Sequence, residues 1–210
     1  MDEIRNLPFL SSNEFIGTNI VCPIAGILFI KKRGVTMEKT TKKWILCYLA
    51  AAALGVLLHF LFTWFPNPVL ALISPVRESI WEHVKLIYFP LLAASLYMGR
   101  GGNGLGRAPW LLSMVVACVI LPGLGYVYHI IFRGEAVIVD LILYFFTLAL
   151  GFLLPKVLWP LCGRPGAEKA AWALTALLGA LIVWFTFFPP TTALFADLGG
   201  AVRTFLTIPV

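Results

Sequence analysis

The stretch WILCYLAAAALGVLLHFLFTWF, residues 44–65, decides the fold class of this chain. It contains no Asp, Glu, Lys or Arg, and it exceeds the roughly 20 apolar residues that a helix needs to cross a bilayer. The whole chain of 210 residues is 60% hydrophobic and only 12% charged. Such a composition excludes a disordered chain and an ordinary soluble domain, because too few polar side chains are present to cover a water-exposed surface. The sequence therefore predicts a membrane protein.

Four further apolar runs follow residues 44–65. Each run is expected to be helical, since a single strand cannot satisfy its backbone hydrogen bonds in lipid. The predicted fold class is therefore all-α, a polytopic membrane helix bundle of about five transmembrane helices. The predicted spans are residues 44–65, 75–98, 110–132, 137–155 and 170–188.

The basic residues indicate the orientation of the chain. Most of them lie before the first predicted span, between the second and third, and between the fourth and fifth. The positive-inside rule then places the N-terminus inside and the C-terminus outside. The net charge of +6 is explained by topology, so no nucleic-acid partner is expected. We expect the lipid bilayer as partner and a multi-pass position in the cell membrane. The basic residues concerned are Lys39, Lys42, Lys43, Arg100, Arg107, Lys156, Arg164 and Lys169.

The beginning of the chain differs from the rest. Its apolar run is short, is interrupted by glycine and proline, and ends in Lys31-Lys32-Arg33. Met37 then opens the sequence MEKTTKK directly before the first strong span, as a natural start would. We predict that residues 1–36 are an extension upstream of a natural start at Met37, and that residues 37–210 form a single transmembrane helical domain.

The polar residues within the spans are expected at one depth. With a rise of about 1.5 Å per residue, His59 lies roughly 22 Å from the inner end of the first span. Ser74-Pro75 is typical of a helix start and would place its following turns at the outer side. The interruption Pro122-Gly123-Leu124-Gly125 predicts a broken helix beside a cavity at the same side. The residues expected near the extracytoplasmic face are His59, Glu78, Glu82, His83, Lys85 and Asp140.

Ionisable side chains inside a bilayer are costly and by default indicate a function. Glu78, Glu82 and Lys85 would share one helix face at i, i+4 and i+7. Imidazoles and carboxylates are ligands of Zn²⁺, Mn²⁺ or Fe²⁺, so a divalent metal ion is one candidate cofactor. A glutamate with a neighbouring histidine could instead act as an acid/base pair. The candidate catalytic residues are Glu78, Glu82, His83, His59 and Asp140, and the candidate metal ligands are Glu82, His83 and His59.

Structural interpretations compete with these roles. Glu82 and Lys85 at i, i+3 form an ordinary ion pair in one of them, and His129 is an interfacial histidine at the end of the third span. The sequence contains no HExxH, GxSxG or cofactor-binding motif that would fix the chemistry.

The run Ser74-Pro75-Val76-Arg77-Glu78-Ser79-Ile80-Trp81-Glu82-His83-Val84-Lys85 resembles the SPVNESxWEHxKL signature of an uncharacterised family of small bacterial membrane proteins. Residues 58–62, 126–140 and 185–197 are similar to that family as well. The resemblance covers about residues 37–210 and implies a membrane location without a reaction. The chain departs from the pattern at Arg77, where the family has Asn, and at its C-terminus.

Three function classes are compatible with these features, and the sequence does not decide whether the protein is an enzyme. The first is an intramembrane enzyme that acts on a lipid or envelope substrate, which a one-sided polar cluster favours. The second is a transporter, channel or small-molecule binding protein, although transporters usually place charges near the midplane. The third is a structural subunit, as a homo-oligomer or in a membrane complex, whose polar cluster holds helices together.

Overall fold

The computed structural model describes residues 23–100 and 105–198, with side chains from Thr41 onward. The chain separates into two compact units, Met1–Lys39 and Thr40–Val210. The second unit holds the helical bundle and everything described below. Residues 1–22 of the predicted extension lie outside the described residues, and the start at Met37 stays a prediction.

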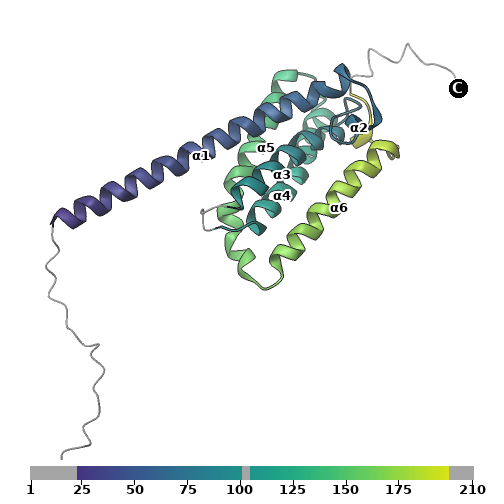
Figure 1. Ribbon diagram of the computed structural model, residues 1–210. Coiled ribbons are helices and arrows are strands. Elements are labelled where there is room, and N and C mark those ends of the chain that lie inside the picture. The colour runs from purple at the N-terminus through teal and green to yellow at the C-terminus, as the bar shows by residue number, and fades with distance from the viewer. Residues whose placement is uncertain (1–22, 101–104, 199–210) are drawn as a thin grey trace, which may run out of the picture. The chain divides into compact units, whose positions relative to one another are not determined.

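Five helices form the bundle, and Figure 1 shows α3, α4, α5 and α6 lying side by side. All regular elements in the described ranges are helical, which confirms the all-α fold class. Four helical segments are long and apolar enough to cross a membrane: Thr41–Trp64, Ala108–Ile131, Val137–Cys162 and Ala167–Phe187. The helices are α1 (Pro23–Trp64), α3 (Lys85–Met98), α4 (Ala108–Tyr126), α5 (Val137–Leu158) and α6 (Ala167–Phe187).

Short helical turns connect and extend the long helices. The turn α2 (Pro68–Ala71) begins at Asn67, whose side-chain oxygen accepts hydrogen bonds from the backbone amides of the next turn. This is the usual capping role of asparagine. The others are η1 (Glu82–Val84), the π-helical turn η2 (Val127–Ile131), η3 (Trp159–Gly163) and η4 (Ala193–Phe195).

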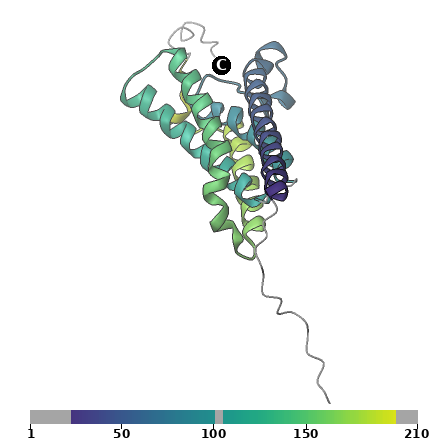
Figure 2. The same cartoon turned by 90° about the vertical axis from the view of Figure 1, so that its left-hand side faces the viewer.

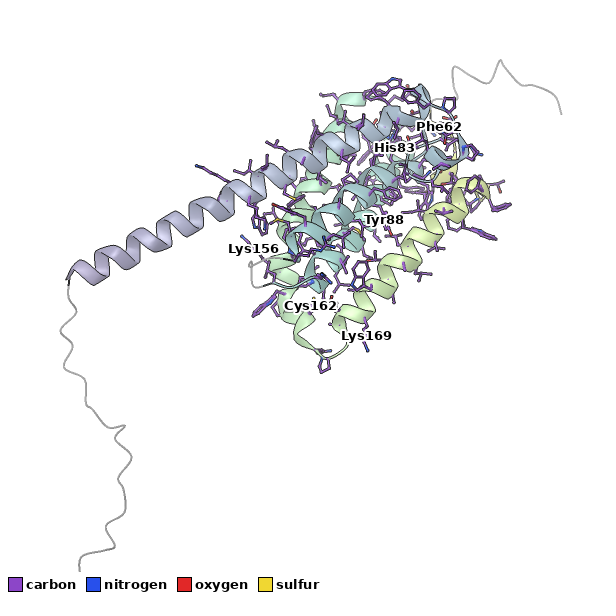
Figure 3. All side chains as sticks on the ribbon, viewed as in Figure 1. Phe62, His83, Tyr88, Lys156, Cys162 and Lys169 are labelled. Atoms are coloured by element: carbon purple, nitrogen blue, oxygen red, sulfur yellow. The ribbon has the colours of Figure 1, made fainter. Side chains whose placement is uncertain are left out.

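Side-chain contacts define the two ends of the bundle. At one end the ring centroids of Trp44 and Trp110 lie 5.1 Å apart, and Lys156 Nζ lies 4.8 Å from the Trp44 ring. At the other end the rings of His59 and His83 lie 5.5 Å apart. We call these the basic end and the histidine end. Figure 3 shows Cys162 and Lys169 near the basic end, Phe62 and His83 near the histidine end, and Tyr88 between them.

The second predicted span is wrong in its first half. Residues 75–81 form no helix, and α3 begins only at Lys85 and has 14 residues. The reason is that Ser74 makes tertiary contacts instead of capping a helix: its hydroxyl donates to Leu58 O and accepts from Phe62 N. Glu78, Glu82 and Lys85 therefore do not share a helix face. The chain still returns through the bundle here, but as an irregular segment followed by a short helix.

A buried lysine holds this irregular segment in place. Lys85 Nζ donates to Glu82 Oε2 at 2.7 Å, to Ala71 O at 2.7 Å and to Ser74 O at 3.1 Å. Glu82 Oε2 also accepts from Val76 N at 3.0 Å. Because irregular backbone at this depth needs internal partners for its polar groups, these bonds make the irregular entry into α3 stable.

The predicted break at Pro122 is also wrong. Helix α4 continues through Pro122 to Tyr126 and passes into the π-helical turn η2. The irregular backbone comes more than two turns later than expected, where Arg133 takes a left-handed backbone conformation with φ of 54°. The loop from there to α5 is closed by Tyr128, whose hydroxyl accepts from Ala136 N at 2.9 Å. In Figure 2, α4 and α5 separate toward this loop.

Candidate functional site

A cavity of about 610 Å³ lies at the histidine end, where α4 and α5 separate. Its apolar wall includes Leu86, Leu121 and Leu143. Its ionisable lining comes from the irregular entry to α3, the turn η2, the loop after it and the first turn of α5: Glu78, His83, His129, Arg133, Glu135 and Asp140. The cavity therefore has an apolar wall on one part of its lining and several charged and imidazole groups on the other.

His83 is oriented by the backbone behind it. Its Nδ1 lies 2.7 Å from Ser79 O, so this nitrogen carries a hydrogen and donates it to the carbonyl oxygen. Its Nε2 lies 3.5 Å from Glu78 Oε2 and faces that carboxylate. A histidine fixed in this way presents a defined nitrogen to whatever binds beside the carboxylate.

His59 completes a group of three donors with Glu78 and His83. Each of these residues offers one ligand atom, and the three atoms lie within 4.8 Å of one another. His59 Nδ1 is buried and has no hydrogen-bond partner within the described residues. A buried imidazole nitrogen without a partner is costly, so this atom would be stabilised by a group that binds beside it.

His129 and Asp140 form a second pair on the same cavity. His129 Nδ1 lies 2.8 Å from Gly134 O, and its Nε2 lies 2.8 Å from Asp140 Oδ1. The hydrogen on Nδ1 donates to the carbonyl, and Nε2 faces the carboxylate. The pair can therefore take up a proton between Nε2 and Oδ1 at the edge of the cavity and give it up again, which is the property of an acid/base group.

The charges around the cavity favour a cation inside it. Among the described residues, the lining holds three carboxylates, Glu78, Glu135 and Asp140, and one guanidinium, that of Arg133. With neutral imidazoles the lining carries two more negative than positive charges. One divalent cation would balance this excess, whereas an anion would increase the repulsion.

The structure brings together some of the residues that the sequence singled out and separates others from them. Glu78, His83 and Asp140 line the cavity, and His59 lies against His83. Glu82 is instead 4% exposed and bound to Lys85, so the predicted ligand set of Glu82, His83 and His59 is not the set that the geometry brings together. Glu78 rather than Glu82 lies close to the two histidines, because the irregular backbone turns Glu82 toward Lys85.

The sequence predicts His129 as an interfacial residue, and no sequence pattern singles out Arg133 or Glu135. The pairing of His129 with Asp140 depends on the short loop between η2 and α5, which brings residues eleven positions apart together. A histidine and an aspartate on either side of the short segment between the predicted spans 110–132 and 137–155 are the signal that the sequence offers.

The segment after α6 packs against the entry to α3. Leu198 N donates to Glu78 O at 2.7 Å, and Trp81 N donates to Leu194 O at 3.0 Å. The ring of Trp81 also lies 5.2 Å from that of Phe195. This segment therefore fixes the backbone that carries Glu78 and His83, which are separated from it by more than 100 residues in the sequence.

Comparison with known proteins agrees with the resemblance seen in the sequence. No curated protein and no solved structure matches the chain. A protein family matches residues 34–201, which include every helix of the bundle from the middle of α1 onward and every residue of the cavity. The chain belongs to this family, DUF6512, a family of unknown function.

Proposed function

We propose that the protein is a membrane-embedded, divalent-metal-dependent hydrolase. The observation that carries the proposal is the group of His59, Glu78 and His83, whose ligand atoms lie within 4.8 Å of one another. Two histidines and one glutamate are the protein ligands of a common type of catalytic zinc site, in which water takes the fourth position. The contact of His83 Nδ1 with Ser79 O supports the proposal, since histidines that bind metal usually donate their other ring hydrogen.

The second histidine pair supports hydrolysis over simple metal storage. A divalent metal ion held by His59, Glu78 and His83 would supply an activated water molecule as the nucleophile. His129 and Asp140 line the same cavity and would take the proton of that water and return it to the leaving oxygen. In this proposal Glu78 and the two other ligands hold the metal, and the pair serves as the acid/base group.

The location supports a substrate that comes from the membrane. Five basic residues lie at the opposite end: Lys43, Arg107, Lys156, Arg164 and Lys169. The positive-inside rule therefore orients the histidine end toward the extracytoplasmic side of a cell membrane. The wall formed by Leu86, Leu121 and Leu143 suits an acyl chain. We therefore propose a lipid or lipid-linked envelope molecule as substrate, cleaved at an ester or phosphodiester bond.

The proposal is tested by hydrolysis of a defined lipid. Phosphatidylethanolamine contains both acyl-ester and phosphodiester bonds, and its cleavage products are separable by mass spectrometry. The full chain in vesicles with added Zn²⁺ is expected to release a cleavage product, and a chelator is expected to stop the release. His129→Gln and Asp140→Asn should reduce the rate by about 10²-fold or more with metal still bound.

A matched control is Glu135→Gln, which removes a carboxylate from the same cavity but none of the proposed ligands or acid/base atoms. It is expected to retain most of the activity. Equal loss in Glu135→Gln and His129→Gln would contradict the assigned roles, and product release that does not respond to the chelator would contradict metal dependence.

A further inference from the structure

A second cavity lies at the basic end, opposite the site proposed above. It has a volume of about 740 Å³ and is formed by the start of α4, the turn η3 and the start of α6. Three cationic side chains line it, those of Arg107, Arg164 and Lys169, together with one carboxylate, that of Glu168. The lining is therefore net positive, in contrast to the negative lining of the cavity at the histidine end.

The cations of this cavity are available to a ligand. Arg164 and Lys169 are exposed. Arg107 Nη1 lies 3.8 Å from Glu168 Oε1, a long contact between two side chains that are 41% and 54% exposed. Exposed pairs of this kind contribute little free energy and are readily exchanged for another partner. Three cations and a single weak internal partner leave positive charge that an anion can neutralise.

The apolar part of the lining favours a phospholipid over a free phosphate ion. Trp159 and Trp172 line the cavity together with Pro109 and Pro160. Trp172 also packs against the small core cluster of Ala108, Leu111 and Ala171, so it is held in place. Tryptophan is typical of the level at which lipid head groups meet the hydrocarbon region. A free phosphate ion would use only the cations, whereas a phospholipid would use the cations and this wall together.

We propose that this cavity binds the head group of an anionic phospholipid. The phosphate would lie among Arg107, Arg164 and Lys169, and the glycerol region would lie against Trp159 and Trp172. With the orientation argued above, the cavity faces the cytoplasmic leaflet, where acidic lipids attract basic residues near the surface. The proposal does not depend on the metal site, because the two cavities share no residue.

Tryptophan quenching by brominated lipids tests the proposal on the full chain in phosphatidylcholine vesicles. Brominated phosphatidylglycerol is expected to quench Trp159 and Trp172 more strongly than brominated phosphatidylcholine at equal content. Trp159→Phe should remove part of this difference. Arg164→Gln with Lys169→Gln should weaken the preference for phosphatidylglycerol about fivefold for each charge removed.

Lys43→Gln is the matched control, since Lys43 lies at the same end over the ring of Tyr97 and outside this cavity. The control should retain the preference for phosphatidylglycerol. Equal quenching by both lipids in the unmutated chain would overturn the proposal. So would an unchanged preference in the Arg164/Lys169 double variant, or a loss in Lys43→Gln as large as in that double variant.

Discussion

Lys85 Nζ lies 2.7 Å from Glu82 Oε2, and both side chains are buried at the point where the chain enters α3. The pair lies between two backbone carbonyls and a backbone amide that have no helical partner. This pair explains how a chain expected to be helical from Pro75 onward can be irregular over residues 75–81. The irregular path in turn frees Glu78 and His83 to meet His59.

Replacing Glu82 by Gln should strongly destabilise the protein, because it leaves the Lys85 ammonium buried without a counter-charge. Loss of one partner of a buried ion pair costs about 3–5 kcal/mol. Thermal unfolding of the purified chain in detergent measures the effect. The control is Glu78→Gln, since the Glu78 side chain is 57% exposed and should tolerate the change. Identical unfolding temperatures for the two variants would contradict a structural role for the Glu82–Lys85 pair.

Gly55 lies where α1 packs tightly against Tyr144 and Leu86. A Cβ atom at this position would lie 2.9 Å from the backbone oxygen of Leu86 and closer still to the Tyr144 hydroxyl. That hydroxyl donates to Ala52 O at 3.2 Å and joins α5 to α1. We expect Gly55→Ala to lower the unfolding temperature, since overpacking typically costs about 1–3 kcal/mol.

Gly123→Ala is the comparison for that substitution. Gly123 also lies in a long helix, but a Cβ atom there would meet nothing within 4 Å. Alanine should be neutral or stabilising by up to about 1 kcal/mol, because it favours helix more than glycine does. If Gly55→Ala proved as stable as Gly123→Ala, the packing of α1 against Tyr144 and Leu86 would be wrong.

The orientation of the chain is tested by labelling a single cysteine. Ala193 is exposed in η4, at the histidine end. In a background without Cys22, Cys47, Cys118 and Cys162, Ala193→Cys should react with a membrane-impermeant maleimide on intact cells. A cysteine at Lys169 should react only after permeabilisation. The reverse pattern would place the proposed metal site on the cytoplasmic side.

The long helices could be predicted because hydrophobicity alone defines them. The predicted spans 110–132, 137–155 and 170–188 correspond to α4 with η2, to α5 and to α6, with ends within about three residues. Continuous apolar runs leave the backbone no alternative to a helix in lipid. The position of the ionisable residues at one end of the bundle could also be predicted, because it depends on where they lie along these helices.

The irregular parts could not be predicted from local sequence. Ser74-Pro75 has the residue types of a helix start, but the Ser74 hydroxyl bonds to α1, sixteen residues earlier. The same tertiary contacts turn Glu82 away from the histidines and bring Glu78 to them. The His129–Asp140 pair depends on the left-handed backbone of Arg133, for which arginine has no preference. Both features are set by packing rather than by propensity.

Metal content measures the central claim most directly. The full chain, purified and equilibrated with Zn²⁺, should retain close to one zinc per chain after removal of free metal. His59→Ala, Glu78→Gln and His83→Ala should each lower the retained zinc by tenfold or more, while His129→Gln should keep it. Absence of bound zinc from the unmutated chain, or retention that is equal in all four variants, would contradict a metal site formed by His59, Glu78 and His83.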